Sequence, residues 1–324
     1  LPTGIDNDGK ERTAVCCLSS LNLDTYDQWK DNAQFVEDVM RFLDNVMTDF
    51  INRAPDEFAN AKYSAMRERS VGLGVMGLHS YFQQKSIPFG SVMSKVWNKK
   101  IFSNIQEKVD AASVSLAEER GACPDAADYG IKERFSNKTA IAPTASISII
   151  CGGSSPGIEP IAANSFTHKT LSGSFNVRNK YLKKILNKYA KDTDEVWSTI
   201  TTNQGSVSHL DFLTAEEKDT FKTAFEIDQR WIIELGADRT PHISQAQSIN
   251  VFIPADIHKK ELHDIHFQAW KKGLKSLYYC RSKSIQRAEN VNKGTSTDVT
   301  KNVYSKDGES NNKDNNYEEC LSCQ

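Results

Sequence analysis

Residues 247–282 read QSINVFIPADIHKKELHDIHFQAWKKGLKSLYYCRS. An apolar run ends at Pro254, a helical pattern follows and stops at Gly273, and a second apolar run holds Tyr278 and Tyr279. The pattern predicts a strand, a helix and a strand with short connections. Such a βαβ unit joins parallel strands and lays its helix over them. The stretch therefore predicts an α/β fold in which helices cover parallel strands.

Tyr278 and Tyr279 are adjacent in the second of these strands. Neighbouring side chains of a strand point to opposite faces, so at most one of the two tyrosines joins a given layer of the core. Because aromatic residues favour strands, an ordinary half-buried strand explains the pair. A functional explanation needs support from other parts of the sequence.

The composition is that of a soluble globular protein of 324 residues, long enough for one large α/β domain or two ordinary domains. Acidic and basic residues are interspersed at a net charge of -2, which argues against nucleic acid as a partner. No apolar run approaches the roughly 20 residues that cross a bilayer, and the segment LPTGIDNDGK lacks the features of a signal peptide. We expect a cytoplasmic protein that binds neither nucleic acid nor membrane, in the host cytoplasm if a phage encodes it.

Helical periodicity recurs along the chain. Residues 29–52 carry apolar side chains at steps of three and four, which predicts a helix with one apolar face, and residues 94–120 predict a second long helix that Gly121 ends. Between them, the glycines of GLGVMG, residues 72–77, suit close backbone packing ahead of a short helix at 78–85. The apolar face predicted in the first helix consists of Phe35, Val36, Val39, Phe42, Leu43, Val46, Met47 and Phe50. The further predicted helices span 178–190, 193–202 and 214–234.

The most unusual composition lies in KTAIAPTASISIICGGSSPGIEP, residues 138–160. It predicts a short buried strand that ends at Pro143, a hydroxyl-rich turn and a glycine loop. The hydroxyls of Thr144, Ser146 and Ser148, together with successive backbone N–H groups, suit phosphate oxygens. The segment lacks the glycine pattern and the lysine of a Walker loop, so an ordinary turn rich in serine and threonine remains the alternative.

Seven cysteines scattered over a long chain do not form the disulfide framework of a secreted protein. Cys16 and Cys17 lie in the strand-like run TAVCCLSSLNL, where adjacent side chains face opposite ways, so we expect one thiol to face a site and the other to face packing. The histidines show no metal-ligand spacing, and we expect no metal site.

From about residue 289 the sequence is rich in Asn, Lys, Ser and acidic residues, which predicts a disordered tail, 289–324, after a folded part, 1–288. The tail ends in Cys320-Leu-Ser-Cys323, and this pair supplies only two of the four ligands of a closed zinc site. Thiol-disulfide exchange is the better use, because a flexible tether raises the thiol concentration at a buried disulfide. An inert end is the alternative.

Taken together, these segments resemble the C-terminal half of the large subunit of class I ribonucleotide reductase, of the ribonucleoside-diphosphate type. The resemblance runs over nearly the whole chain, and phage and bacterial versions are the nearest in style. It implies the second half of a ten-stranded α/β barrel built from two five-stranded halves, whose open sheet edge needs a partner. The motifs, in chain order, are LPT, AVCCLSSLNL, RSVGLGVMGLHSYF, ERGACP, IAPTASIS, GIEP, QSINVFIP, GLKSLYYCRS and the terminal CxxC.

The resemblance also implies roles for individual residues. Cys16 matches the cysteine that gives a reducing equivalent to the substrate and ends in a disulfide, whereas Cys17 stands where the family commonly has a small polar residue. Tyr278 and Tyr279 match a stacked pair that relays a radical from the small subunit. The tail pair, Cys320 and Cys323, matches the thiols that re-reduce the active-site disulfide. The substrate diphosphate would be held by Pro143, Thr144, Ala145, Ser146 and Ile147.

Several parts of such an enzyme precede LPT in the family: the radical-bearing cysteine of an NxCxE motif, the partner of the Cys16 disulfide and the regions that bind ATP and dNTP effectors. We therefore expect an N-terminal half, either as a separate chain or removed by truncation. The other implied partners are the small radical-generating subunit, thioredoxin or glutaredoxin, and a ribonucleoside diphosphate. We expect this chain to bind no cofactor and to depend on the metal and tyrosyl radical of the small subunit.

Two other functions are compatible with parts of the sequence. A non-catalytic scaffold of the same fold would compete for the small subunit or thioredoxin, but it would need neither the tyrosine pair, nor the phosphate loop, nor the CxxC. A free-standing thiol oxidoreductase would need a CxxC of low pKa at a helix N-terminus, whereas this one lies in a polar tail.

Overall fold

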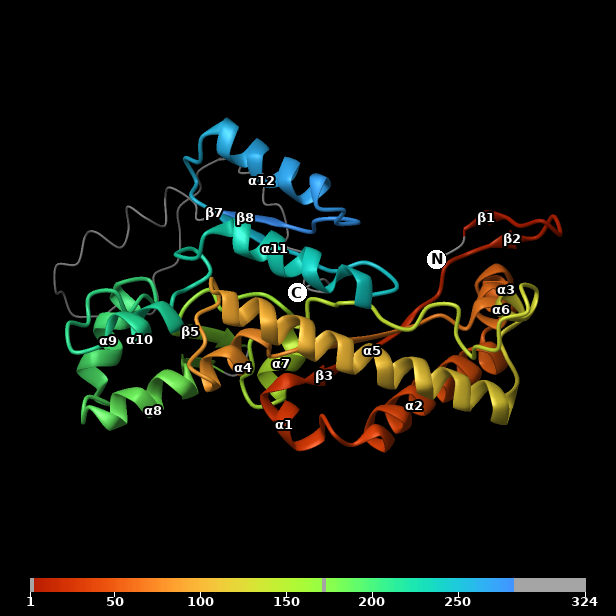
Figure 1. Cartoon of the computed structure of the whole chain (residues 1–324), viewed down its shortest axis with the longest axis horizontal. Coiled ribbons are helices and arrows are strands. Elements are labelled where there is room, and N and C mark those ends of the chain that lie inside the picture. The colour runs from red at the N-terminus through yellow and green to blue at the C-terminus, as the bar shows by residue number, and fades with distance from the viewer. Residues whose placement is uncertain (1–2, 171–172, 283–324) are drawn as a thin grey trace, which may run out of the picture.

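The computed structural model describes residues 3–170 and 173–282. Its longest helix, α5 (Val92–Arg120), extends across the molecule, with α2 (Ala33–Arg53) beside its C-terminal part and α11 (Gln229–Arg239) beside its N-terminal part (Figure 1). Side-chain contacts agree with this placement: Glu119 of α5 binds Arg41 of α2, and Lys95 of α5 binds Glu234 of α11. These helices cover the parallel strands.

Parallel strands form the centre of the fold. Strand β3 (Cys17–Asn22) pairs with β4 (Val71–Met76), and β7 (Val251–Ile253) pairs with β8 (Cys280–Ser282), both in parallel. Single parallel bridges, Leu73 to Thr139 and Ile141 to Gln247, join these pairs through the extended segment 139–141. Five parallel segments therefore lie side by side in chain order, as the βαβ pattern predicts.

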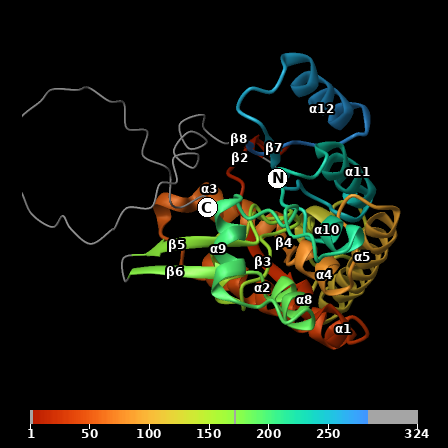
Figure 2. The same ribbon diagram turned by 90° about the vertical axis from the view of Figure 1, so that its left-hand side faces the viewer.

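Two antiparallel hairpins, which the sequence did not predict, lie outside this sheet. Strands β1 (Gly4–Ile5) and β2 (Glu11–Arg12) form one, and β5 (Ser165–Thr170) and β6 (Gly173–Arg178) form the other, which projects from the body of the molecule (Figure 2). The remaining helices are α1 (Tyr26–Trp29), α3 (Ala59–Glu68), α4 (Leu78–Gln84), α6 (Pro124–Ala127), α7 (Ala145–Ile150), α8 (Lys180–Lys188), α9 (Asp194–Thr202), α10 (Ala215–Thr220) and α12 (Lys259–Lys271). Short 3-10 turns span Leu23–Thr25, Asp56–Phe58 and Thr240–His242.

The prediction of one helix over 214–234 is wrong. Helix α10 ends at Thr220, because the backbone N–H and the hydroxyl of Thr223 bind the Glu226 carboxylate and turn the chain. The Asp228 side chain then caps α11 by accepting a hydrogen bond from the Arg230 N–H. Local side-chain capping therefore divides a continuous helical pattern into two helices.

The predicted apolar face of α2 is only partly buried. Val36, Leu43 and Met47 lie in the core, whereas Phe42 is 61% exposed. Periodicity shows which side chains share a face, but the position of the neighbouring elements decides how much of that face is covered. The packing of α2 against α5 buries one edge of the predicted face and leaves the other edge exposed.

Glycines in β4 allow the strands on either side to approach closely. A Cβ atom on Gly74 would lie 2.3 Å from the carbonyl oxygen of Ala140, and one on Gly72 would lie 2.4 Å from a methyl carbon of Leu18. Both distances are far shorter than a van der Waals contact. The close packing predicted for GLGVMG is thus confirmed, and β4 has room only for hydrogen at these two positions.

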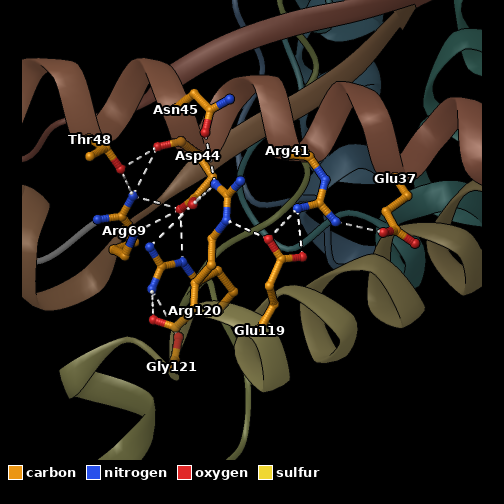
Figure 3. A network of polar contacts seen from close by, with 10 residues as sticks. Glu37, Arg41, Asp44, Asn45, Thr48, Arg69, Glu119, Arg120 and Gly121 are labelled. Carbon is orange, nitrogen blue, oxygen red and sulfur yellow. Dashed lines mark hydrogen bonds and ion pairs between the residues drawn. The ribbon is translucent and has the colours of Figure 1, made fainter.

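A buried carboxylate holds the surrounding helices together. Asp44 of α2 is fully buried and accepts hydrogen bonds from Arg69 (2.8 Å), Arg120 (2.8 Å) and Arg134 (2.9 Å). The contacts continue from Glu119 to Arg41 and Glu37 along the facing surfaces of α2 and α5 (Figure 3). The cluster joins α2 to the α3–β4 turn and to the end of α5.

The charge state of Asp44 follows from two opposed effects. Burial raises the pKa of this carboxyl, but the hydrogen bonds from Arg134 and Arg120 and the charge of Arg69 outweigh burial and lower it. A carboxylate whose folded-state pKa is depressed stabilises the fold above its unfolded-state pKa. This contribution is lost as the pH falls through the folded-state pKa.

We predict that Gly74→Ala lowers the free energy of unfolding by about 2 kcal/mol or more, because the new methyl group meets backbone rather than a flexible side chain. The matched control is Gly236→Ala in α11, where the close atom, 2.9 Å away, is the terminal methyl of Ile249 and alanine favours the helix. Urea unfolding should show the control within about 1 kcal/mol of the parent. Equal effects of the two substitutions would contradict the packing argument.

We predict that Asp44→Asn destabilises the fold by about 3–5 kcal/mol at pH 7, because three arginines lose the charge that compensates them. Asp49→Asn on the same helix is the control: Asp49 is 63% exposed and pairs with exposed Arg53, so less than about 1 kcal/mol is expected. Urea unfolding measures both changes. The difference between parent and Asp44→Asn should shrink in acid, and a difference that does not depend on pH would contradict the charge argument.

Candidate functional site

A cavity of about 260 Å3 lies near the starts of the first, fourth and fifth parallel segments and beside the third. It is lined by Pro143 at the end of the third segment, by Gln245 at the start of the fourth and by Tyr278 just before the fifth. Leu18 of β3 completes this side of the cavity. The fold thus brings Pro143 of the predicted phosphate loop and one of the predicted tyrosines to a common space, whereas residues 144–147 do not line this cavity.

Cys16 lies beside this cavity and immediately before β3. Its sulfur accepts a hydrogen bond from Gln245 Nε2 at 3.4 Å. Burial raises the pKa of the Cys16 thiol, the Gln245 hydrogen bond opposes that rise, and the Glu68 carboxylate adds to it. Cys17 packs against the hydrophobic core, and burial raises the pKa of its thiol as well. Cys17 therefore faces packing, and Cys16 contacts Gln245, a residue that lines the cavity.

The rings of Tyr278 and Tyr279 lie against each other, with centroids 4.1 Å apart and planes tilted by 51°. Both side chains are partly exposed. The prediction that strand alternation sends them to opposite faces is wrong, because the pair precedes β8 rather than lying within it. The backbone is nevertheless anchored, since the Tyr278 N–H donates to the Ile249 carbonyl at 2.8 Å and the Tyr279 carbonyl accepts from the Val251 N–H at 2.9 Å.

The segment after Pro143 turns sharply into α7. Thr144 adopts a left-handed backbone conformation with φ of 54°, and its hydroxyl accepts a hydrogen bond from the Gly157 N–H at 2.7 Å. Ala145, Ser146 and Ile147 form the first turn of α7. The hydrogen bond closes the loop 144–157 on itself, so the start of α7 is fixed relative to Gly157.

A buried pair that the sequence analysis missed supports the tyrosines. Glu159 is 6% exposed, and both of its carboxylate oxygens lie 3.0 Å from Asn250 Nδ2. The carbonyl oxygen of the Asn250 side chain accepts a hydrogen bond from the Tyr279 N–H at 3.0 Å. Burial raises the pKa of Glu159, and Asn250 and the charge of Arg281 oppose that rise only in part. No local pattern marks Glu159 or Asn250, because their contact joins residues 91 positions apart.

A larger cavity of about 450 Å3 lies on another side of α7, between this helix, α4 and the start of α8. Its walls are mostly apolar, and its polar side chains already bind one another: Asn179 donates to Gln83 Oε1 at 2.9 Å and to Asn164 Oδ1 at 2.7 Å. Ala145 and Ser148 of the predicted phosphate-binding segment line it, whereas Cys16, Tyr278 and Tyr279 do not. The sequence analysis did not anticipate this cavity.

Three further predictions concern metals, membranes and the tail. Within residues 3–170 and 173–282, no group of acidic residues, histidines and cysteines could hold a metal ion. None of the helices in this part of the chain is long and apolar enough to span a bilayer. Cys320 and Cys323 lie outside the described residues.

The buried histidine His79 accepts a hydrogen bond from the Ile161 N–H. Burial lowers the pKa of His79 to about 3, so the ring is neutral and its role is structural.

Comparison with known proteins identifies relatives of the chain. The family model described as the barrel domain of ribonucleotide reductase matches residues 5–129 and 124–280. The ribonucleoside-diphosphate reductase large subunit of Invertebrate iridescent virus 6 is 50% identical over 284 residues, which cover 86% of this chain and 29% of that protein. The putative large subunit of Frog virus 3 is 42% identical over 285 residues, which cover 87% of this chain and 49% of that protein.

A solved structure gives a similar result. The alpha subunit of a class Id ribonucleotide reductase from Actinobacillus ureae superposes with a TM-score of 0.78 at 39% sequence identity, and the match covers 84% of this chain and 50% of that one. The chain therefore spans half or less of the length of these relatives.

We predict that Glu159→Gln keeps the fold as stable as the parent or makes it more stable at pH 8. The raised folded-state pKa means that the folded protein binds this proton more tightly than the unfolded chain does, so stability falls as the pH rises from the usual carboxyl pKa through the folded-state pKa. Each unit of that rise corresponds to about 1.4 kcal/mol, and glutamine removes the loss while keeping an oxygen for Asn250.

Thermal unfolding at pH 4 and pH 8 measures this difference. The gain of Glu159→Gln over the parent should appear at pH 8 and vanish at pH 4, whereas Glu107→Gln on the exposed surface of α5 should change little at either pH. A variant that is less stable than the parent at pH 8 would contradict the argument.

Proposed function

The chain belongs to the ribonucleotide reductase barrel-domain family, and on this premise we propose that it supplies the second half of the catalytic barrel of a ribonucleoside-diphosphate reductase large subunit. The reaction replaces the 2′-hydroxyl of a ribonucleoside diphosphate by hydrogen and releases water, while two thiols become a disulfide. One observation carries the proposal: Pro143, Tyr278 and Gln245, which holds Cys16, line a single cavity.

Cys16 would be one of the two reducing thiols. Its sulfur is half-buried next to the cavity, and its raised pKa keeps a proton on the thiol for transfer to the substrate. The second thiol would come from the N-terminal part of the large subunit. The oxidised product is then a disulfide that links Cys16 to that part.

The loop Pro143–Ile147 would hold the substrate diphosphate. The backbone N–H groups at the start of α7 and the hydroxyls of this segment are donors that suit phosphate oxygens. Support comes from the hydrogen bond between Thr144 and Gly157, which fixes the loop directly after Pro143, the loop residue that lines the cavity.

Tyr279 and Tyr278 would carry the radical toward the cavity. Electron and proton transfer between phenols requires short distances, and the two rings are in contact. Tyr278 lines the cavity, and both rings are partly exposed, so a partner can reach the outer one. The metal and tyrosyl radical of the small subunit would supply the oxidising equivalent.

Cys320 and Cys323 would return electrons to the active-site disulfide, and thioredoxin or glutaredoxin would reduce them in turn, in the cytoplasm. ATP and dNTP effectors would bind the N-terminal part. A non-catalytic scaffold of the same fold is the second candidate function, but contact between two tyrosines and a thiol held beside a phosphate loop serves no purpose in a scaffold.

The test is reduction of a ribonucleoside diphosphate by the purified chain, alone and together with an N-terminal half, the small subunit, ATP and a dithiol. We expect turnover only in the complete mixture. In that mixture, Tyr278→Phe should lower turnover at least a hundredfold and leave substrate affinity unchanged, because phenylalanine keeps the ring but loses the redox-active hydroxyl.

Tyr129→Phe is the matched control, since Tyr129 is 80% exposed and does not line the cavity. Full turnover by the Tyr278→Phe mixture would refute the radical relay. Absence of turnover from every mixture, with folded and associated halves, would favour the scaffold.

A further inference from the structure

The side chain of Gln245 makes two hydrogen bonds with one nitrogen. Nε2 donates to the backbone carbonyl of Val71 at 2.9 Å and to the sulfur of Cys16 at 3.4 Å. A carbonyl oxygen only accepts hydrogen bonds, so the amide nitrogen, and not the amide oxygen, must face Val71. The same orientation directs the second N–H of the amide at Cys16.

The backbone of Gln245 is fixed as well. Its N–H donates to the Thr139 carbonyl at 3.0 Å, and its carbonyl accepts from Lys275 Nζ at 2.8 Å. Lys275 also donates to the carbonyl of Ser244 at 2.7 Å. The amide therefore occupies a rigid position between β4, the segment 139–141 and the residues that lead to Tyr278.

We propose that Gln245 is a positioning residue for Cys16: its anchored amide holds the sulfur beside the cavity and donates a hydrogen bond to the thiolate when Cys16 loses its proton. The use of that thiolate rests on the proposed function, but the contact itself does not. Nothing in the residue types or their spacing indicated Gln245, because the contact joins residues 229 positions apart.

The surroundings of Cys16 give this hydrogen bond its importance. A Cβ atom on Gly72 would lie 3.2 Å from the sulfur, so the thiol packs against a position of β4 that has no side chain. The site is also desolvated, and the Glu68 carboxylate adds negative charge to it. Burial and Glu68 both oppose a thiolate, and Gln245 favours it.

The thiolate is needed when an external dithiol reduces a disulfide that contains Cys16. A thiolate of the dithiol attacks the partner sulfur, the old S–S bond breaks, and Cys16 leaves with the electron pair and later takes a proton from water. A second attack within the mixed disulfide releases the partner thiol and leaves the dithiol oxidised. A donor already directed at the sulfur stabilises the leaving thiolate without reorganisation.

The experiment measures the thiol rather than turnover. The full chain carrying Cys17→Ser is alkylated with iodoacetamide between pH 6 and pH 10.5, and the modification of Cys16 is quantified by peptide mass spectrometry. In Gln245→Leu the midpoint of the pH profile should rise, and the rate at pH 8 should fall roughly three- to tenfold, because a hydrogen bond to the thiolate is lost.

Two controls accompany this measurement. Cys151 is exposed and reports, in the same sample, any general change of reactivity or folding. Gln34→Leu makes the same substitution at an exposed position of α2, where Gln34 binds only Asp38 among the described residues, and should leave the Cys16 profile unchanged.

A Cys16 rate and midpoint in Gln245→Leu that match the reference, with Cys151 unchanged, would overturn the proposal. If Gln245→Leu fails to fold, the same measurement is made on Gln245→Asn, whose shorter side chain cannot reach both Val71 and Cys16. An unchanged Cys16 rate and midpoint in that variant would likewise overturn the proposal. The alkylation experiment does not depend on turnover, so its result stands even if the chain has no reductase function. Conversely, a negative alkylation result would not refute the reductase function, which the turnover assay tests separately.

Discussion

The close approach of strands at β4 is the constraint on which the rest of the structure depends. A Cβ atom on Gly72 would lie 2.4 Å from a methyl carbon of Leu18, and one on Gly74 would lie 2.3 Å from the Ala140 carbonyl oxygen, so a side chain at either position would push its neighbour away. Because those neighbours stay in contact, the start of β3, residues 140–143 and residues 245–248 line one cavity. The position of Cys16 relative to Pro143 thus depends on glycine at positions 72 and 74.

The helical layer depends on a different interaction. Asp44 is fully buried and compensates the charges of three arginines from separate parts of the chain. Because removal of one partner leaves a buried charge without compensation, this carboxylate ties α2 to the end of α5. None of the residues labelled in Figure 3 lines the cavity, so the cluster and the cavity involve separate groups of residues.

The sequence predicted those parts of the fold whose cause is local. The βαβ pattern of residues 247–282 predicted parallel strands, and GLGVMG predicted close packing, because periodicity and glycine act over a few residues. The prediction that the side chains of Tyr278 and Tyr279 point to opposite faces was wrong, because the strand begins only at Cys280. The sequence did not indicate three residues of the site, Gln245, Glu159 and Asn250, because only tertiary contacts bring them there.

A single segment of the chain positions both the Cys16 thiol and the tyrosine pair. Gln245 and Asn250 belong to one segment, whose first residue binds the Cys16 thiol and whose sixth binds both Glu159 and the backbone of Tyr279. Asn250 is 1% exposed, and burying its polar side chain has a cost that only these hydrogen bonds offset. A shift of this segment would move the thiol and the tyrosine pair together, so their separation is set by a single piece of backbone.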